Sequence, residues 1–296
     1  MTDIVYTAVY EVPGVVAGWT TPEHIDTNAA MLRNILDPLT RVARVRRVVL
    51  LQGSKAYGVH LHGMPVPARE RMPRDDHPNF YWVQEDQVRG LAPVAGFDWT
   101  ILRPGDIHGP RYGVSFNKIP VVGVYAAICD ELGLEFGFPG GAPTIRQGTD
   151  CGLLARAIRW AVRASTASNE IFNVTNGEVF TWRDVWPAIG ATLGVEATAD
   201  TPRSMAEFLP EHRDTWARIV DEQGLRPLAL DEVLGQSHFV ADFSFSYGVE
   251  VPPPPVIMST IKIKQAGFTE TCDTERSIRH WLQALVDSRV IPGVRG

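Results

Sequence analysis

Two side chains in this 296-residue sequence have the chemistry of an acid and of a cation that assists it. Tyr81 lies in HPNFYWVQED, at the start of a helical pattern, and its phenol is protonated at neutral pH, so it can donate to an oxygen that gains negative charge. A nearby ammonium makes that proton easier to give. Glu85, one helical turn further on, has the wrong charge for this task. The cation must therefore come from another element.

Lys55 is the candidate for this cation. It follows the short apolar run of residues 47–53, which is typical of a strand with both faces covered by helices. In open α/β sheets, ligands bind at the carboxyl ends of the strands. We therefore predict that Lys55 and Tyr81 meet at this edge. From spacing alone, a solvated loop lysine and a core tyrosine remain the alternative.

Strand and helix patterns alternate through the first part of the chain and predict an α/β fold with a parallel sheet. Strands are expected at 3–12, 47–53, 97–104, 134–138 and 171–174, and helices at 25–36, 77–94, 117–132 and 150–164. The C-terminal third is expected to be mostly helical. We divide the chain into residues 1–115, a partial Rossmann-like core with the Lys/Tyr pair, and residues 116–296, a substrate-binding lobe with late core strands and C-terminal helices.

Composition narrows the classes of function. No apolar run is long enough to span a bilayer, and the first residues do not read as a signal peptide, so we predict a cytoplasmic protein without membrane contact. A net charge of −6 with scattered basic residues gives no reason to expect nucleic acid. Three widely spaced cysteines indicate neither a disulfide framework nor a zinc site. No nucleophile elbow is present, so hydrolase chemistry has no support.

Several strings resemble one known family. They are LLQGSKAYG, PNFYWVQED, WTILRPGDIHGP, VVGVYAAICDELG and EIFNVTNGEVFTWRDVWP. In this order the chain resembles the progesterone 5β-reductase and iridoid synthase-like group of short-chain dehydrogenases, from residue 3 almost to its C-terminus. The fold that this resemblance implies is an extended short-chain dehydrogenase type, incomplete at its N-terminal side, with a helical substrate lobe.

The resemblance also implies an activity. Lys55 and Tyr81 match the active lysine and tyrosine of the group, and Glu85 stands where ordinary short-chain dehydrogenases keep lysine. The group reduces the double bond of an enone with hydride from NADPH, so Tyr81 and Lys55 would stabilise the enolate of a small apolar carbonyl substrate. The further residues that we assign are cofactor contacts at Ala8, Val9, Pro104 and Ile107, and substrate contacts at Trp82 and Phe116; no metal is expected.

One part of the family pattern is not matched. Relatives begin with a strand, a Gly-x-x-Gly-x-x-Gly turn and a helix that receive the cofactor's pyrophosphate, and this sequence begins at what resembles their fourth strand. The segment from Gly14 to Gly18 also follows a strand, but it lacks the third glycine and the acidic residue after the next strand. We interpret it as a connecting loop.

Three functions therefore remain open at this point. The chain is a trimmed NADPH-dependent reductase, or a complete enzyme that uses Tyr81 and Lys55 without nucleotide for isomerisation, cyclisation or aldol-type chemistry, or a non-catalytic relative that binds a ligand or partner.

Other chemical groups give weaker signals. We interpret His60 and His62 as a loop pair without metal, because no third ligand follows them, and His108 as a solvated histidine. The aromatic residues Tyr125, Phe136 and Phe138 are expected in the core.

If the sequence is complete, the missing strands and helices would leave an apolar sheet edge uncovered. We therefore predict a homo-oligomer or another covering element, and light scattering checks this. A well-behaved monomer without such a cover would contradict it.

Overall fold

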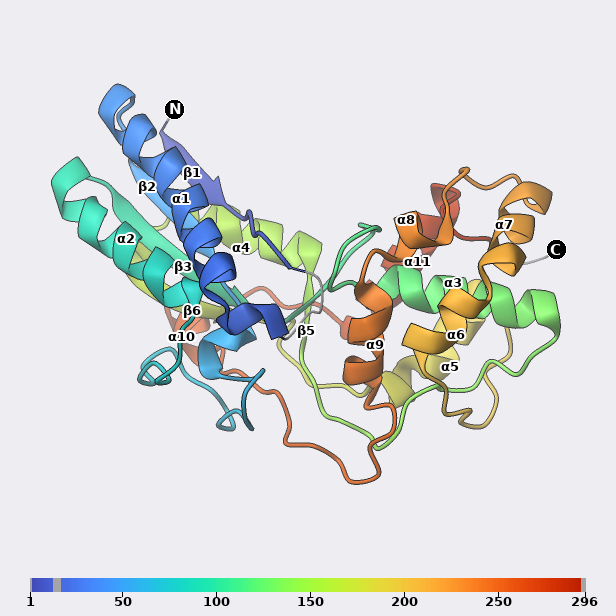
Figure 1. The fold of residues 1–296 in the computed structure, drawn as a ribbon. Helices are drawn as coiled ribbons and strands as arrows, with labels where there is room; N and C mark the ends of the chain where they lie inside the picture. The colour runs from blue at the N-terminus through green and yellow to red at the C-terminus, as the bar shows by residue number, and fades with distance from the viewer. Residues whose placement is uncertain (1, 13–16, 294–296) are drawn as a thin grey trace. The chain divides into compact units, whose positions relative to one another are not determined.

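The computed structural model describes residues 2–12 and 17–293, and these form two compact units (Figure 1). The first contains residues up to 106 together with 152–177 and 256–271, and the second contains 107–151, 178–255 and residues from 272 onward. The chain therefore passes between the units several times. The predicted division into a core of residues 1–115 and a substrate-binding lobe of residues 116–296 stays a prediction.

The first unit is built around a parallel sheet. Its strands are β1 (Asp3–Tyr6), β2 (Arg47–Leu51), β3 (Asp98–Pro104) and β6 (Glu170–Val174), in the spatial order β1-β2-β3-β6. Its helices are α1 (Pro22–Val42), α2 (Phe80–Ala95), α4 (Cys151–Arg163, whose first residue belongs to the second unit) and α10 (Ile261–Gln265), with 3-10 helices at Ala17–Thr20, Ser54–Tyr57 and Ser165–Ala167. The predicted α/β class is confirmed.

Helices cover both faces of this sheet. One face packs against α1 and α2 through an apolar cluster that includes Leu32, Leu36, Val48, Leu50, Val88, Ala92 and Ile101. On the other face, the Trp160 ring of α4 lies 5.3 Å from the Phe172 ring of β6. Central strand β2 is buried along most of its length, which explains why its sequence is continuously apolar.

The first strand is shorter than predicted. Residues 3–12 were expected to be extended throughout, but β1 ends at Tyr6, where its register with β2 reaches Leu50. Beyond that point β2 soon ends, and the N–H of Tyr10 instead donates to the Asn28 side chain of α1 at 2.8 Å. Among the described residues β1 pairs only with β2, and its Val5 side chain is 44% exposed.

The second unit is mostly helical. Its elements are β4 (Asp106–His108, whose first residue belongs to the first unit), α3 (Lys118–Leu132), β5 (Gly148–Asp150), α5 (Trp182–Leu193), α6 (Met205–Glu211), α7 (Arg213–Glu222), α8 (Leu230–Leu234), α9 (Ser237–Phe245) and α11 (Thr274–Asp287). Helix α3 is apolar on all sides and lies in the core. Tyr125, Phe136 and Phe138 are buried, which confirms their prediction as core residues.

Two predictions in the second unit are wrong. The expected strand at 134–138 is reduced to a single bridge between Phe136 and Ala197. Residues 198–203 donate to the carbonyls of Phe136, Phe138 and Pro139, but these bonds do not keep the even spacing of a parallel ladder. His108 is fully buried instead of solvated, and its ring packs 5.5 Å from that of Trp182.

A buried carboxylate fastens α2 to the sheet. Glu85 of α2 is 3% exposed and pairs with Arg103 of β3 at 3.3 Å, with Arg89 of its own helix at 2.8 Å and with Arg74 of the preceding loop at 3.3 Å. A buried charge is tolerated only when it is paired in this way. The residue that occupies the position of the expected lysine thus serves the packing of α2.

We predict that Glu85→Ala lowers the free energy of unfolding by about 3–5 kcal/mol, because it leaves the buried guanidinium of Arg103 without its counter-charge. Urea denaturation measures this. Asp26→Ala, at an exposed position of α1, is the control and should change stability by less than about 0.5 kcal/mol. A loss in Glu85→Ala as small as that of the control would show that the cluster does not hold the helix.

Candidate active site

Asn79 joins the element of Tyr81 to that of Lys55. It is 2% exposed and forms the N-cap of α2, where its Oδ1 accepts from the N–H of Tyr81 at 3.0 Å. Its Nδ2 donates to the carbonyl of Lys55 at 3.2 Å. Lys55 belongs to the 3-10 helix that follows β2, as the sequence predicts for a residue at the carboxyl end of this strand. One amide side chain therefore fixes both backbones.

The side chains of Lys55 and Tyr81 contact the same indole ring. The Nζ of Lys55 lies 3.4 Å from the centroid of the Trp19 ring, which is a short cation–π contact. The Tyr81 ring meets the same indole edge to face, with centroids 5.3 Å apart. Trp19 is only 3% exposed. A substrate carbonyl that touches the phenol and the ammonium must therefore share the space around this ring.

Glu11 supplies the negative charge of the cluster. Its Oε2 accepts from the Trp19 indole at 3.2 Å. Burial lowers the pKa of Lys55 to about 7, and the attraction of Glu11 opposes part of that shift. Burial likewise raises the pKa of Glu11, against the effect of Lys55. Near neutral pH, the amine is therefore close to the midpoint of its titration.

Two histidines surround the same amine. The His60 ring lies 5.9 Å from that of Trp19, and burial together with the charge of Lys55 lowers its pKa to about 4. His24 lies 5.1 Å from the same indole, and burial and Lys55 lower its pKa as well. Both imidazoles are thus held in the neutral form.

The phenol of Tyr81 is held protonated. Burial raises its pKa, the charge of Glu11 raises it further, and the guanidinium of Arg103 lowers it. At neutral pH, Tyr81 is therefore a proton donor. An ideal Cβ placed on Gly53 would lie 3.4 Å from the Tyr81 hydroxyl and 3.8 Å from the Pro104 carbonyl oxygen. The Tyr81 hydroxyl therefore lies beside Gly53, which follows the end of β2.

Arg103 is held in place by two partners from different elements. Its Nε donates to the Gln52 side chain at 2.9 Å, and its Nη2 pairs with Glu85. Gln52 in turn donates to the carbonyl of Tyr81 at 3.0 Å. The guanidinium is therefore tied to β2 and to α2, and it is the cation that acts on the pKa of the phenol.

The other predicted site residues of the first unit lie in three places. Ala8 and Val9 follow the end of β1 and are exposed, and Pro104 is the buried last residue of β3. Trp82 is buried with its ring 5.2 Å from the Arg74 guanidinium and 5.8 Å from that of Arg103. It therefore packs with the arginine cluster of α2, and its predicted substrate contact stays a prediction.

The remaining predicted residues lie elsewhere in the chain. Ile107 of β4 is 40% exposed and Phe116 precedes the N-cap of α3; both belong to the second unit. Of the segment from Gly14 to Gly18, residues 14–16 lie outside the described residues, and the last two belong to the 3-10 helix Ala17–Thr20.

Sequence reasoning missed four members of this cluster: Glu11, Trp19, His24 and Arg103. No spacing rule connects them with Lys55 or Tyr81, because they come from a loop, two helices and a strand. A weak signal was available, since Glu11 and Trp19 follow the carboxyl end of a parallel strand, where ligands bind in such sheets.

The residues predicted to contact a nicotinamide lie at one edge of the sheet. Ala8 and Val9 follow the carboxyl end of β1 and are exposed, and Pro104 ends β3 with its carbonyl oxygen near Gly53. These positions are compatible with the predicted cofactor contacts, which stay a prediction. No glycine-rich turn for a pyrophosphate occurs among residues 2–12 and 17–293. Across this same part of the chain, no group of three or more His, Cys, Asp or Glu side chains could hold a metal ion, and no helix is long and apolar enough to cross a membrane.

Comparison with known proteins points to one family. The profile of a PRISE-like Rossmann-fold domain matches residues 20–240. A short chain dehydrogenase from Penicillium aethiopicum is 32% identical over 69% of this chain and 59% of its own length. An (S)-8-oxocitronellyl enol synthase from Camptotheca acuminata is 33% identical over 92% of this chain and 72% of its own length. The chain thus spans less than two thirds of the first of these relatives.

Solved structures show the same fold at low identity. RMD from Pseudomonas aeruginosa, complexed with NADPH, superposes with a TM-score of 0.65 at 14% identity, over 95% of this chain and 79% of that one. UDP-glucose 4-epimerase from Thermotoga maritima superposes with a TM-score of 0.64 at 14% identity, over 97% and 77%.

We predict that Lys55→Met changes how stability depends on pH. Because burial lowers the pKa of folded Lys55 from 10.5 to about 7, the unfolded chain binds more protons between these values, and the wild type gains stability as pH rises through this window. The variant loses this gain, by at most about 1.4 kcal/mol per pH unit. Urea unfolding at several pH values from 6.5 to 9 measures it, with Lys264→Met as the control. Parallel profiles for the wild type and Lys55→Met would contradict the assigned environment.

Proposed function

The chain belongs to the PRISE-like Rossmann-fold family, and from this membership we propose that it is a nicotinamide-dependent reductase of the short-chain dehydrogenase type. The substrate class that we propose is a small apolar enone or a related compound with a carbonyl-activated double bond, and the cofactor that we propose is NADPH. Two named relatives, a short chain dehydrogenase and an enol synthase, support this choice.

One observation carries the proposal. A protonated phenol, Tyr81, and an amine with a pKa of about 7, Lys55, both contact the buried ring of Trp19 near the carboxyl ends of the strands. An oxygen that becomes negative during a reaction is stabilised by donors that are already oriented in a site with little water. Tyr81 and Lys55 are such donors.

The chain's own residues would divide the task as follows. A reduced nicotinamide, when bound, would supply a hydride to the β-carbon of the enone. Tyr81 donates its hydroxyl hydrogen bond to the carbonyl oxygen as this oxygen becomes an enolate, and Lys55, when protonated, adds a positive charge. Arg103 lowers the pKa of the phenol and makes that hydrogen bond stronger. Ala8, Val9 and Pro104 would contact the nicotinamide end of the cofactor.

A second function is supported by the same cluster. Glu11 and two neutral imidazoles, His24 and His60, lie around Lys55, so bases for proton transfer are present beside the proton donor. This arrangement suits an isomerase, cyclase or aldolase reaction on a carbonyl substrate that needs no nucleotide. The reductase needs NADPH and the acid–base enzyme does not, so the dependence of activity on NADPH distinguishes the two functions.

We expect the nicotinamide fluorescence of NADPH to change saturably as the purified protein is titrated with it. We also expect the protein to oxidise NADPH when 2-cyclohexen-1-one is present. Tyr81→Phe should lower the turnover number by about 10²- to 10⁴-fold because the donor to the enolate is lost. NADPH affinity should change little, since the phenol is assigned to the substrate oxygen. Tyr247→Phe, at an exposed tyrosine of the second unit, is the control and should keep full activity.

If the protein converts a carbonyl substrate without nucleotide and Tyr81→Phe abolishes this activity, the nucleotide-independent acid–base function is favoured over the reductase function. Activity that persists in both Tyr81→Phe and Lys55→Met would remove the catalytic assignment and favour a ligand-binding relative.

A further inference from the structure

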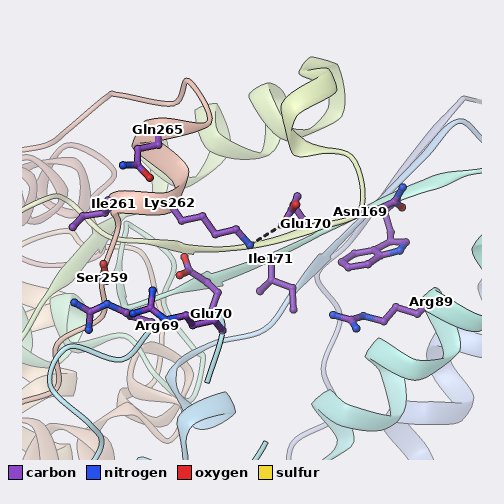
Figure 2. A pocket seen from close by; sticks show the side chains of 12 residues that line it. Arg69, Glu70, Arg89, Asn169, Glu170, Ile171, Ser259, Ile261, Lys262 and Gln265 are labelled. Atoms are coloured by element: carbon purple, nitrogen blue, oxygen red, sulfur yellow. Dashed lines mark hydrogen bonds and ion pairs between the residues drawn. The ribbon is translucent and has the colours of Figure 1, made fainter. Parts of the chain in front are cut away.

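A cavity lies in the first unit, at the other end of the sheet from Lys55. Its volume is about 640 Å³, which is in the range of small-molecule sites. Its walls include Trp99, near the start of β3, and residues 169–171, at the start of β6 (Figure 2). Lys55, by contrast, follows the carboxyl end of β2. The cavity is therefore separate from the Tyr81 cluster.

Four basic and two acidic side chains line this cavity. They are Arg69, Arg71, Arg89, Lys262, Glu70 and Glu170. Lys262 pairs with Glu170 at 2.7 Å, the ion pair that Figure 2 shows as a dashed line. The carboxylate of Glu70 accepts the backbone N–H of Asn173, the outward-facing N–H of edge strand β6, at 2.8 Å. Both acidic groups therefore already have partners.

Arg69 and Arg71 are not neutralised in this way. Within the described part of the chain no carboxylate pairs with either of them, and the Arg69 guanidinium donates to the Pro67 carbonyl at 3.2 Å. Arg89 pairs with Glu85, but that carboxylate also pairs with Arg74 and Arg103. The cavity therefore carries an excess of positive charge, concentrated where Arg69 and Arg71 lie.

The other lining residues are three apolar side chains, Trp99, Ile171 and Ile261, and three uncharged polar ones, Asn169, Ser259 and Gln265. Ile171 lies between the Glu70 and Lys262 side chains on one side and Arg89 on the other (Figure 2). Ile261 is 59% exposed and also lines the cavity. The Arg89 guanidinium lies over the Trp99 ring, 4.8 Å from the centroid of that ring. A ligand that combines an anionic group with a hydrocarbon body would therefore contact both the arginines and the apolar side chains of this cavity.

We propose that this cavity is a binding site for an organic phosphate monoester. A phosphate monoester carries close to two negative charges at neutral pH and three acceptor oxygens, which matches the two guanidiniums of Arg69 and Arg71 with their forked N–H donors. The organic part lies against Ile171 and Ile261. The Ser259 hydroxyl, on the same wall, is available to a phosphate oxygen. This site goes beyond the proposed reductase function and does not depend on it.

Isothermal titration of the full chain with phenyl phosphate tests the site, with inorganic phosphate and benzoate as comparisons. Phenyl phosphate should bind saturably and more tightly than inorganic phosphate, because its ring contacts the apolar wall. Arg71→Gln, at an exposed position, should weaken both phosphates by about tenfold, and Arg69→Gln/Arg71→Gln by more. Arg159→Gln/Arg163→Gln removes two exposed arginines of α4 and should leave both affinities unchanged.

Ile261→Asn separates the apolar contact from the charge. It should weaken phenyl phosphate by about threefold and leave inorganic phosphate unaffected, since the exposed side chain touches only the organic part. Thermal denaturation confirms that each variant folds.

Three outcomes would overturn the proposal. They are no saturable binding of phenyl phosphate, equal weakening by the α4 control, and tighter binding of benzoate than of phenyl phosphate, which would make the ligand a carboxylate.

Discussion

The buried carboxylate of Glu85 is the interaction on which the arrangement of the first unit depends. Its pairs with Arg74, Arg89 and Arg103 join a loop, helix α2 and strand β3 at one point. Because the Glu85 carboxylate and the Arg103 guanidinium are buried, a rotation of α2 about its axis that separates them would cost several kcal/mol. The rotation of α2 in turn determines which way Tyr81 faces. A packing interaction thereby orients the candidate acid.

The same interaction gives Arg103 and Lys55 different electrostatic roles. In the pattern that the sequence first suggests, one lysine on the helix of the tyrosine serves the phenol directly. Here Arg103, held by Glu85 and Gln52, acts on the pKa of Tyr81, while Lys55 lies over Trp19 in the field of Glu11. The amine is left with a pKa of about 7, so its charge responds to small changes in its surroundings. A ligand that displaces water or shifts Trp19 would alter that charge.

The two ends of the sheet have different electrostatic character. At the carboxyl ends, charges are few, buried and balanced around aromatic rings, which suits a reaction that creates a transient negative charge on an apolar molecule. At the amino end of β6, arginines are exposed and in excess, which suits the recognition of a stable anion. Strand β1, at the far edge of the sheet from β6, has no partner on its outer side among the described residues, and the relatives are longer than this chain.

The sequence by itself determined the elements whose signals are local. A continuous apolar run marked β2, a proline marked the end of β3, helices were expected to begin near residues 77 and 117, and the strings around Lys55 and Tyr81 indicated the family. Contacts between residues of different elements were decided only by the tertiary structure. The strand expected at 134–138 does not form because its bonds to residues 198–203 do not keep the regular register of a ladder, and His108 is buried because aromatic rings from another segment cover it. Trp19, Glu11 and Arg103 reach the candidate site by folding, since no periodicity records which side chains from separate elements share one buried volume, and burial is what sets their charges.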